Sequence, residues 1–369
     1  MHQKMKQICA VAFLLVVLVT TVTTQDTTRD IEYVSISRSV DASVPIGDEP
    51  IVAVVPTDDE PIAAVVPTGD ELIAAVKKQE PGLVRELIKK GANVNFSQSV
   101  DGYFNGFTPV MYASQQNSVP ILKALIEAGA DVNAKTISDG STALHLATQR
   151  AGNETVVPLL EAGADPSAIN DYSQTPLHFA AQVEDAASIN ALLDYSVDTV
   201  NVTDTQGYAP IHYASQLLNP AALDFLIDVW ADVELKTTHG NTPLHLAARK
   251  QLGEPDSVTS LLEVGAIPDV QDLHGNGPLH YAAEQKTSEI AKALLLAGAS
   301  WNLKNAFGQT ALHRAVEYGN TALVNLLATS CVAVHVKDVN NFDPIYYARH
   351  RKSPGLVRIL QSKCNNDNA

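Results

Sequence analysis

Six histidines recur at one position of a repeated four-residue motif, and their spacing is the first feature that could indicate chemistry. Most follow Thr-Pro-Leu or a close variant, and successive members are 33 to 35 residues apart: His145, His178, His212, His245, His280 and His313. Imidazole is a common zinc ligand, but its nitrogen must lie about 2 Å from the ion. Equivalent positions of stacked helical units lie roughly 10 Å apart. We therefore expect no metal site, and expect each imidazole to hydrogen-bond backbone in its own or the next loop.

Two cysteines could form a disulfide. Cys331 and Cys364 lie 33 residues apart, and the third cysteine, Cys9, lies in an apolar N-terminal segment. A bridge requires Cα atoms about 4.4–6.8 Å apart, which is closer than regular stacking places equivalent positions. The end of the chain can bend inward, however. The sequence thus leaves open both a Cys331–Cys364 bridge and two unpaired thiols.

Three Asn-X-Ser/Thr sequons are candidate glycosylation sites, at Asn95, Asn153 and Asn201. Such sites carry sugar only on chains that enter the secretory pathway. We expect Asn153, in a turn between two predicted helices, to be the most accessible of the three. At Asn95 and Asn201, which follow predicted helices, a chance match is the alternative.

Catalytic motifs are missing from the sequence. It contains no G-x-S-x-G, H-E-x-x-H, G-x-G-x-x-G, Walker loop or C-x-x-C, which are local signatures of common nucleophilic, metal, phosphate-binding and redox sites. The repeats described below account for nearly all residues expected to be ordered. We therefore expect neither an enzyme nor a cofactor.

The N-terminal 24 residues have the pattern of a signal peptide. Lys4 and Lys6 precede an apolar run from Ile8 to about Val19, followed by small residues before a predicted cleavage after Thr24. A membrane anchor is the alternative, although even Ile8 to Val22 is shorter than the about 20 apolar residues needed to span a bilayer. The sequence therefore predicts a secreted or lumenal protein with no membrane insertion after cleavage.

The charge excludes some partners. The chain has 25 Lys and Arg against 41 Asp and Glu, and the expected mature chain, without Lys4 and Lys6, has a net charge of −18. Such a surface is repelled by phosphate backbones and anionic lipid. Nucleic acid is therefore a poor candidate partner, and we expect a monomer that binds a protein.

Residues 25–68 are predicted to form an acidic linker. Residues 25–46 are polar and lack helical periodicity. An 11-residue pattern then occurs at 47–57 and again at 58–68, and its third copy, from Gly69, loses both prolines. A helix becomes possible there. We interpret the first two copies as an extended stalk; the alternative is that residues 51–55 and 62–66 pair as strands or pack on the open end of the repeats described below.

From residue 69 onwards a longer repeat organises the chain. The four-residue motif begins at Thr108, Thr142, Thr175, Ala209, Thr242, Gly277, Thr310 and Asp343. Thr is a helix N-cap and Pro suits the first helical turn, so each motif predicts a helix start. A second apolar helix follows and ends at a glycine such as Gly298. A period of this length is typical of a repeat architecture.

These motifs resemble the ankyrin repeat over residues 69–364, with 365–369 as a tail, in about nine units of which the first and last are degenerate. The resemblance implies an all-α solenoid of stacked antiparallel helix pairs with projecting β-hairpin-like loops. It also implies a concave face that binds protein partners through loop tips and first helices. The positions matching that face include Phe104, Phe107, Tyr172, Tyr208, Gln216, His239, Arg249, His274, Glu284 and Phe307.

Two functions remain open. The favoured interpretation is a secreted binding protein, and the alternative is a secreted toxin or effector that binds a target in or on another cell. Aromatic residues at several loop tips could anchor a partner; alternatively, Phe104, Phe107 and Phe307 pack within their own loops.

Overall fold

The structure, a computed structural model, describes residues 66–366 apart from residues 100, 101, 103, 151, 184, 218, 250–254, 286, 329 and 330. All described residues belong to one compact unit, 62–369. The predicted signal peptide, the linker up to residue 65 and the proposed strand pairing lie outside the described residues.

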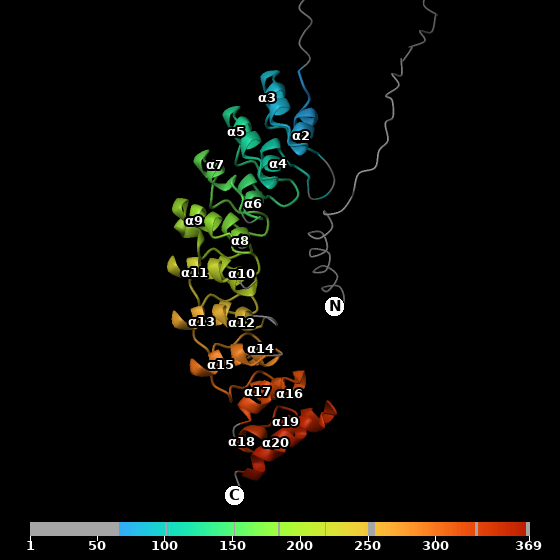
Figure 1. The fold of residues 1–369 in the computed structure, drawn as a ribbon, viewed down its shortest axis with the longest axis vertical. Helices are drawn as coiled ribbons and strands as arrows, with labels where there is room; N and C mark the ends of the chain where they lie inside the picture. Colours follow the sequence, from blue (N-terminus) through green and yellow to red (C-terminus); the bar gives the residue numbers. More distant parts are fainter. Residues whose placement is uncertain are drawn as a thin grey trace, which may run out of the picture. The chain divides into compact units, whose positions relative to one another are not determined.

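The described chain forms helices that come in successive pairs (Figure 1). The first helices of the pairs are α2 Gly69–Lys77, α4 Pro109–Gln115, α6 Ala143–Ala147, α8 Pro176–Ala180, α10 Pro210–Leu217, α12 Pro243–Ala248, α14 Pro278–Ala283, α16 Ala311–Tyr318 and α19 Pro344–His350. The second helices are α3 Pro81–Lys89, α5 Val119–Glu127, α7 Val156–Glu161, α9 Ala186–Tyr195, α11 Pro220–Asp228, α13 Asp256–Glu263, α15 Glu289–Leu296, α17 Thr321–Leu327 and α20 Pro354–Asn366. Two short helices, η1 Val197–Thr199 and α18 Cys331–Val334, complete the set.

Each pair packs against its neighbours and shares a continuous core with them. First helices contact first helices, as α10 does α12, and second helices contact second helices, as α9 does α11 (Figure 1). Small residues such as Ala214 and Ala247 allow the close approach of the first helices and are almost fully buried. Large residues such as Leu177, Ile189 and Leu223 fill the space between pairs. Burial of each such side chain contributes about 1.5–3 kcal/mol, so the stack itself provides most of the stability.

The loops between pairs have hairpin-like hydrogen bonding, although the described residues contain no β-strand. In one loop, the N–H of Asp272 donates to the carbonyl of Asn276, while Asp272 Oδ1 accepts from the N–H groups of His274 and Asn276 at 2.8 Å. Gly275 stands at the turn with φ +72°, and a Cβ there would lie 2.7 Å from the backbone nitrogen of Ala306 in the next loop. Glycine is therefore required both for the left-handed turn and for the contact between loops.

Most second helices end in a left-handed residue, as the sequence predicts. Gly129, Gly163, Gly265 and Gly298 have φ between +83° and +94°. After α11 this residue is Trp230, with φ +66°. The left-handed conformation costs a residue with a Cβ roughly 1–2 kcal/mol. Trp230 is nevertheless 88% exposed, so burial of its ring does not offset that cost.

Candidate interaction surface

The six motif histidines lie inside the stack, where each ring joins two backbone groups. Each Nδ1 accepts the N–H of the first motif residue at 3.0–3.1 Å. Because Nδ1 accepts, Nε2 carries the proton and donates to a backbone carbonyl of the next loop at 2.9–3.4 Å. These carbonyls belong to Gln174, Tyr208, Leu235, Asn276, Gln309 and Phe342. The structural role that we expected for these histidines is confirmed.

Protonation of these histidines is strongly disfavoured. Burial lowers the pKa of His145 to about 4 and that of His212 to about 4. Burial also lowers the pKa of the remaining four, His178, His245, His280 and His313. A proton on Nδ1 would in addition face a backbone N–H. These rings are therefore neutral structural links.

Where the motif lacks histidine, the contacts differ. Met111 Sδ accepts the N–H of Thr108 at 3.4 Å. At the last motif, Asp343 Oδ1 caps the helix by accepting the N–H of Tyr346 at 2.8 Å. Among the described residues, no group of three or more His, Cys, Asp or Glu side chains could hold a metal ion.

A row of exposed loop residues runs from repeat to repeat. In each loop one residue donates its N–H to a carbonyl of the preceding loop at 2.9–3.0 Å. We call these residues the tip row: Ile137, Asp171, Thr205, Thr238, Leu273, Ala306 and Val339. All are exposed. The backbone bonds hold neighbouring tips side by side, so side chains from several loops can contact one partner.

Seven of the ten predicted contact residues are exposed. Among the aromatic residues, Tyr172 and Phe307 are each 57% exposed and Phe104 is 42% exposed. The exposed polar residues are Gln216, His239, Arg249 and His274. Phe104 also packs within its own loop, with its ring centroid 5.1 Å from that of Phe107. The packing of Phe104 within its own loop is thus observed, and its role as a contact residue stays a prediction.

Phe107 was wrongly predicted as a contact residue. It is fully buried and packs against Tyr112, with ring centroids 5.0 Å apart. The residue after the turn glycine is buried or half-buried in other loops as well, as Asn241 and Gln309 are. Tyr208 occupies the same position; it is half-buried, and its ring lies 5.3 Å from that of Tyr213.

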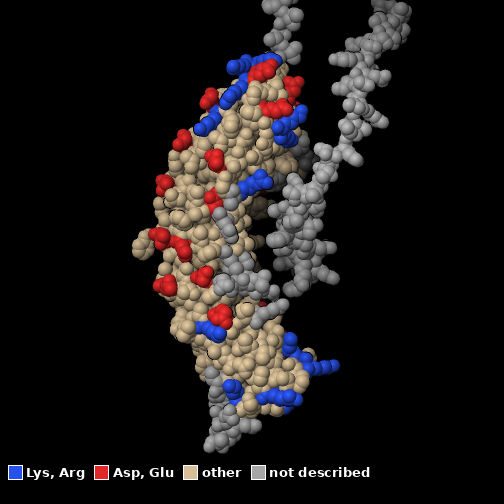
Figure 2. Space-filling view, in the orientation of Figure 1, with Lys and Arg blue, Asp and Glu red and all other residues tan. Residues whose placement is uncertain are grey.

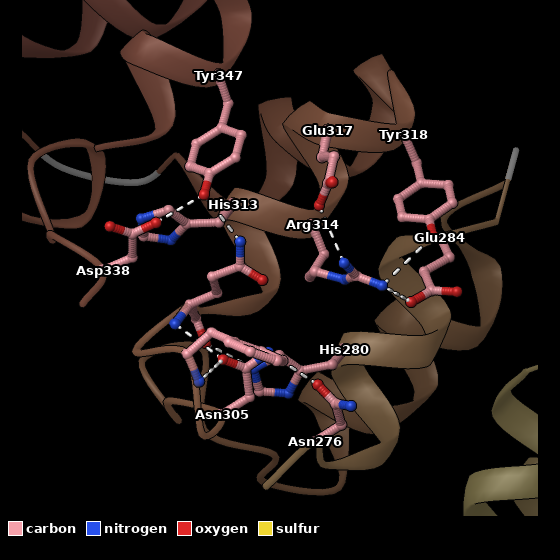
Figure 3. A network of polar contacts seen from close by, with 12 residues as sticks. Asn276, His280, Glu284, Asn305, His313, Arg314, Glu317, Tyr318, Asp338 and Tyr347 are labelled. Atoms are coloured by element: carbon pink, nitrogen blue, oxygen red, sulfur yellow. Dashed lines mark hydrogen bonds and ion pairs between the residues drawn. The ribbon is translucent and has the colours of Figure 1, made fainter. Parts of the chain in front are cut away.

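Glu284 is half-buried in an ion-pair cluster on the first helices. Figure 3 shows the guanidinium of Arg314 between the carboxylates of Glu284 and Glu317, with Tyr318 beside it. The Arg314 side chain is 21% exposed, and its guanidinium lies 5.0 Å from the Tyr318 ring centroid. Arg314, which directly follows the motif histidine His313, was not among the predicted contact residues.

Three successive loops each carry an exposed large apolar residue. Leu273 is 73% exposed, Phe307 is 57% exposed and Val339 is 66% exposed. Val339 donates its N–H to the carbonyl of Phe307, and Ala306 donates to His274, so the three loops are joined. We call Leu273, Phe307 and Val339 the tip patch. Leu273 and Val339 were not among the predicted contact residues.

The family model for ankyrin repeats matches the chain in overlapping segments, at residues 72–170, 150–237, 177–272, 216–305 and 279–368. The chain belongs to the ankyrin-repeat family. Proteins of this family typically bind other proteins and are not enzymes. No helix among the described residues is long and apolar enough to cross a membrane.

Similar proteins contain ankyrin repeats in different contexts. Ankyrin repeat protein FPV031 of fowlpox virus is 35% identical over 131 residues, which cover 35% of this chain and 37% of that protein. SH3 and multiple ankyrin repeat domains protein 2 of Homo sapiens is 28% identical over 77% of this chain and 13% of its own length. ZDHHC13 of Danio rerio, which is named as a palmitoyltransferase, is 29% identical over 59% of this chain and 34% of its own length. The chain thus spans less than two fifths of each of these relatives.

The sequons occupy different environments in the ankyrin array. Asn153 is only 6% exposed, and its Nδ2 donates to the carbonyl of Ser114 at 3.0 Å. The expectation that Asn153 is the most accessible of the three was therefore wrong: the turn that contains it is covered by the preceding repeat. Asn95 and Asn201 are exposed, and their Oδ1 atoms accept the N–H groups of Asp131 and Asp232 at 2.7 and 2.9 Å.

The predicted pairing of Cys331 with Cys364 concerns side chains outside the described part of the structure. Both the disulfide and the unpaired thiols remain predictions.

Proposed function

We propose that this ankyrin-repeat chain is a binding protein that enters the secretory pathway and holds a protein partner on its loop tips and first helices. We interpret the pairs from α2–α3 to α19–α20 as nine repeats, with the outermost two covering the ends of the core. The charge of the chain, −16 over its full length, favours a protein over nucleic acid as partner.

The observation that supports this proposal best is the tip patch. Leu273, Phe307 and Val339 place three large apolar side chains in water on adjacent loops. The first helices carry the Arg314 cluster and Arg249, which lies 5.8 Å from the Tyr281 ring centroid, and their contacts orient these charges. Interfaces combine apolar anchors with a polar rim in this way.

A matched pair of variants tests the surface. The full chain is used for affinity purification from its natural source, and the recovered partner is titrated against the double variant Leu273→Ser/Phe307→Ser. We expect binding to weaken by about tenfold or more, as for loss of interface anchors. The control is Leu296→Ser, since Leu296 is 90% exposed at the end of a second helix. Equal affinity of the double variant and the wild type would remove the tip patch from the site.

The secretory route has a separate test. Protein recovered from culture medium is sequenced from its N-terminus, and we expect it to begin at Gln25. A chain that stays in the cells and begins at Met1 would contradict secretion without affecting the binding proposal. Loss of sugar in the variants Asn95→Gln and Asn201→Gln, but not in Asn153→Gln, would agree with the exposure of the three side chains.

A further inference from the structure

A second exposed apolar surface lies on the other helices of the repeats. It is formed at the ends of α9, α11 and α13 by Tyr195, Val197, Phe225, Trp230 and Val264, which we call the outer ridge. Trp230 is 88% exposed, and the others are between 36% and 54% exposed. These residues lie on second helices and the segments after them, so the outer ridge is separate from the tip patch.

The members of the outer ridge lie close together because their segments are bonded to one another. The N–H of Asp232, just after Trp230, donates to Asn201 Oδ1 at 2.9 Å. The N–H of Ile267, just after α13, donates to Glu234 Oε1 at 2.7 Å. Helices α9, α11 and α13 also pack in succession (Figure 1). The exposed side chains therefore lie on neighbouring segments of three successive repeats.

Among the residues of the outer ridge, Trp230 has a backbone conformation and an exposure that do not stabilise the fold. It occupies the left-handed position that glycine fills after α5, α7, α13 and α15. A glycine there would satisfy the backbone without strain. The chain instead has its largest type of side chain, strained and almost wholly in water. Strain of this kind is typical of functional positions.

The charge around the outer ridge is of one sign. Residues 151–235 contain 13 Asp and Glu and no Lys or Arg. Asp194, Asp198, Asp224 and Asp228 are exposed next to the apolar residues, and none forms an ion pair among the described residues. Asp194 and Asp228 also lie in last helical turns, where the helix dipole disfavours a negative charge. Figure 2, in which α9, α11 and α13 lie along the left side as in Figure 1, shows Asp and Glu there without Lys or Arg among them.

We propose that the outer ridge binds a protein segment that combines Arg or Lys with apolar residues. An arginine of the partner stacks on the Trp230 ring, which is the most favourable side chain for a cation–π contact. Its other basic residues face the unpaired carboxylates, and its apolar residues cover Val197 and Phe225. A metal ion or polyamine would use the carboxylates but would leave the apolar residues in water.

The test uses a fluorescein-labelled synthetic peptide of repeating Arg-Leu-Ser and a matched peptide with Glu in place of every Arg. Binding to the full chain is followed by fluorescence anisotropy. The chain has only two tryptophans, so in the variant Trp301→Phe all tryptophan emission comes from Trp230. We expect the Arg peptide to bind, to shift the Trp230 emission to shorter wavelength and to bind more weakly as salt rises. The Glu peptide should do none of these. Binding without an emission shift would contradict the proposal.

Two variants and their controls locate the surface. Trp230→Gly places glycine where glycine is preferred, so the variant folds, and we expect it to bind the Arg peptide about tenfold more weakly, as for loss of a cation–π contact. Asp194→Asn/Asp228→Asn should weaken binding to a similar extent. The control Asp70→Asn/Glu80→Gln removes the same charge from exposed residues at α2 and α3, and Phe307→Ser alters only the tip patch. If Trp230→Gly binds like the wild type, or if both charge variants weaken binding equally, the attraction is non-specific and the proposal is wrong.

Discussion

At the residue scale, each motif histidine works as a two-ended link. Its Nδ1 fixes the start of its own helix, and its Nε2 holds the next loop, so one side chain satisfies two backbone groups that water cannot reach. His245, for example, joins the N–H of Thr242 and the carbonyl of Asn276 at 3.1 Å each. A neutral imidazole can do this because one ring nitrogen accepts while the other donates.

Replacement of one such link should be costly. We expect His245→Ala to lower the free energy of unfolding by about 2–3 kcal/mol, because it leaves a buried N–H and a buried carbonyl without partners. His239→Ala, at an exposed tip in the preceding loop, should change it by less than about 0.5 kcal/mol. Urea denaturation followed by circular dichroism measures both. Equal effects of the two substitutions would show that the buried hydrogen bonds contribute little.

At the element scale, the ends of the second helices determine which surface the repeats offer. Seven of these helices, α5, α7, α9, α11, α13, α15 and α17, have no basic residue in the last turn. A cation there would stabilise the helix. In α5, α7, α9, α11 and α13 the last turn instead carries an exposed acidic residue, so these helix ends contribute to an acidic surface.

The stability of the end of α11 can be tested directly. Replacement of Trp230 by glycine removes the cost of the left-handed conformation, about 1–2 kcal/mol. Glycine loses more backbone entropy on folding, which offsets part of this stabilisation. We expect Trp230→Gly to stabilise the chain by about 0.5–1 kcal/mol. Gly298→Ala, at φ +92°, should destabilise it by about 1 kcal/mol. Thermal unfolding of both variants shows whether each is more or less stable than the wild type. A Trp230→Gly variant less stable than the wild type would mean that the ring has contacts important for folding.

Much of the fold could be predicted from sequence because its causes are local. The Thr-Pro caps, the turn glycines and the apolar positions of each helix recur in the sequence, and the structure places them as expected. The interaction surface was harder to predict, since exposure depends on which neighbouring repeat covers a residue. Phe107 and Phe307 both lie next to a turn glycine, yet the first is buried and the second exposed. Asn153 was misplaced for the same reason: Ser114, its partner, belongs to the preceding repeat.

At the scale of the whole molecule, the histidines make stability depend on pH. All six pKa values are lowered by burial, so the unfolded chain, with pKa values of about 6.5, binds protons first as the pH falls. The stability from the neutral rings is complete above about pH 6.5 and is lost towards about pH 4, the pKa of His145 and His212.

We therefore expect the urea midpoint to fall between about pH 7 and about pH 5, with each unit of pKa shift contributing about 1.4 kcal/mol per histidine. The double variant His239→Ala/His274→Ala, which removes two exposed histidines and leaves all six motif histidines in place, serves as control. A midpoint that is the same at both pH values would contradict the assignment of the links.

The direction of these links has a consequence for how such a chain can change in evolution. Each motif histidine donates from Nε2 to a carbonyl of the loop that follows its own repeat, and each residue of the tip row donates its N–H to a carbonyl of the loop before it. A unit duplicated or deleted in register brings with it one donor and one acceptor of each kind, so the new junction is satisfied at once. The array can therefore lengthen or shorten by whole units while the tip patch and the outer ridge diverge independently.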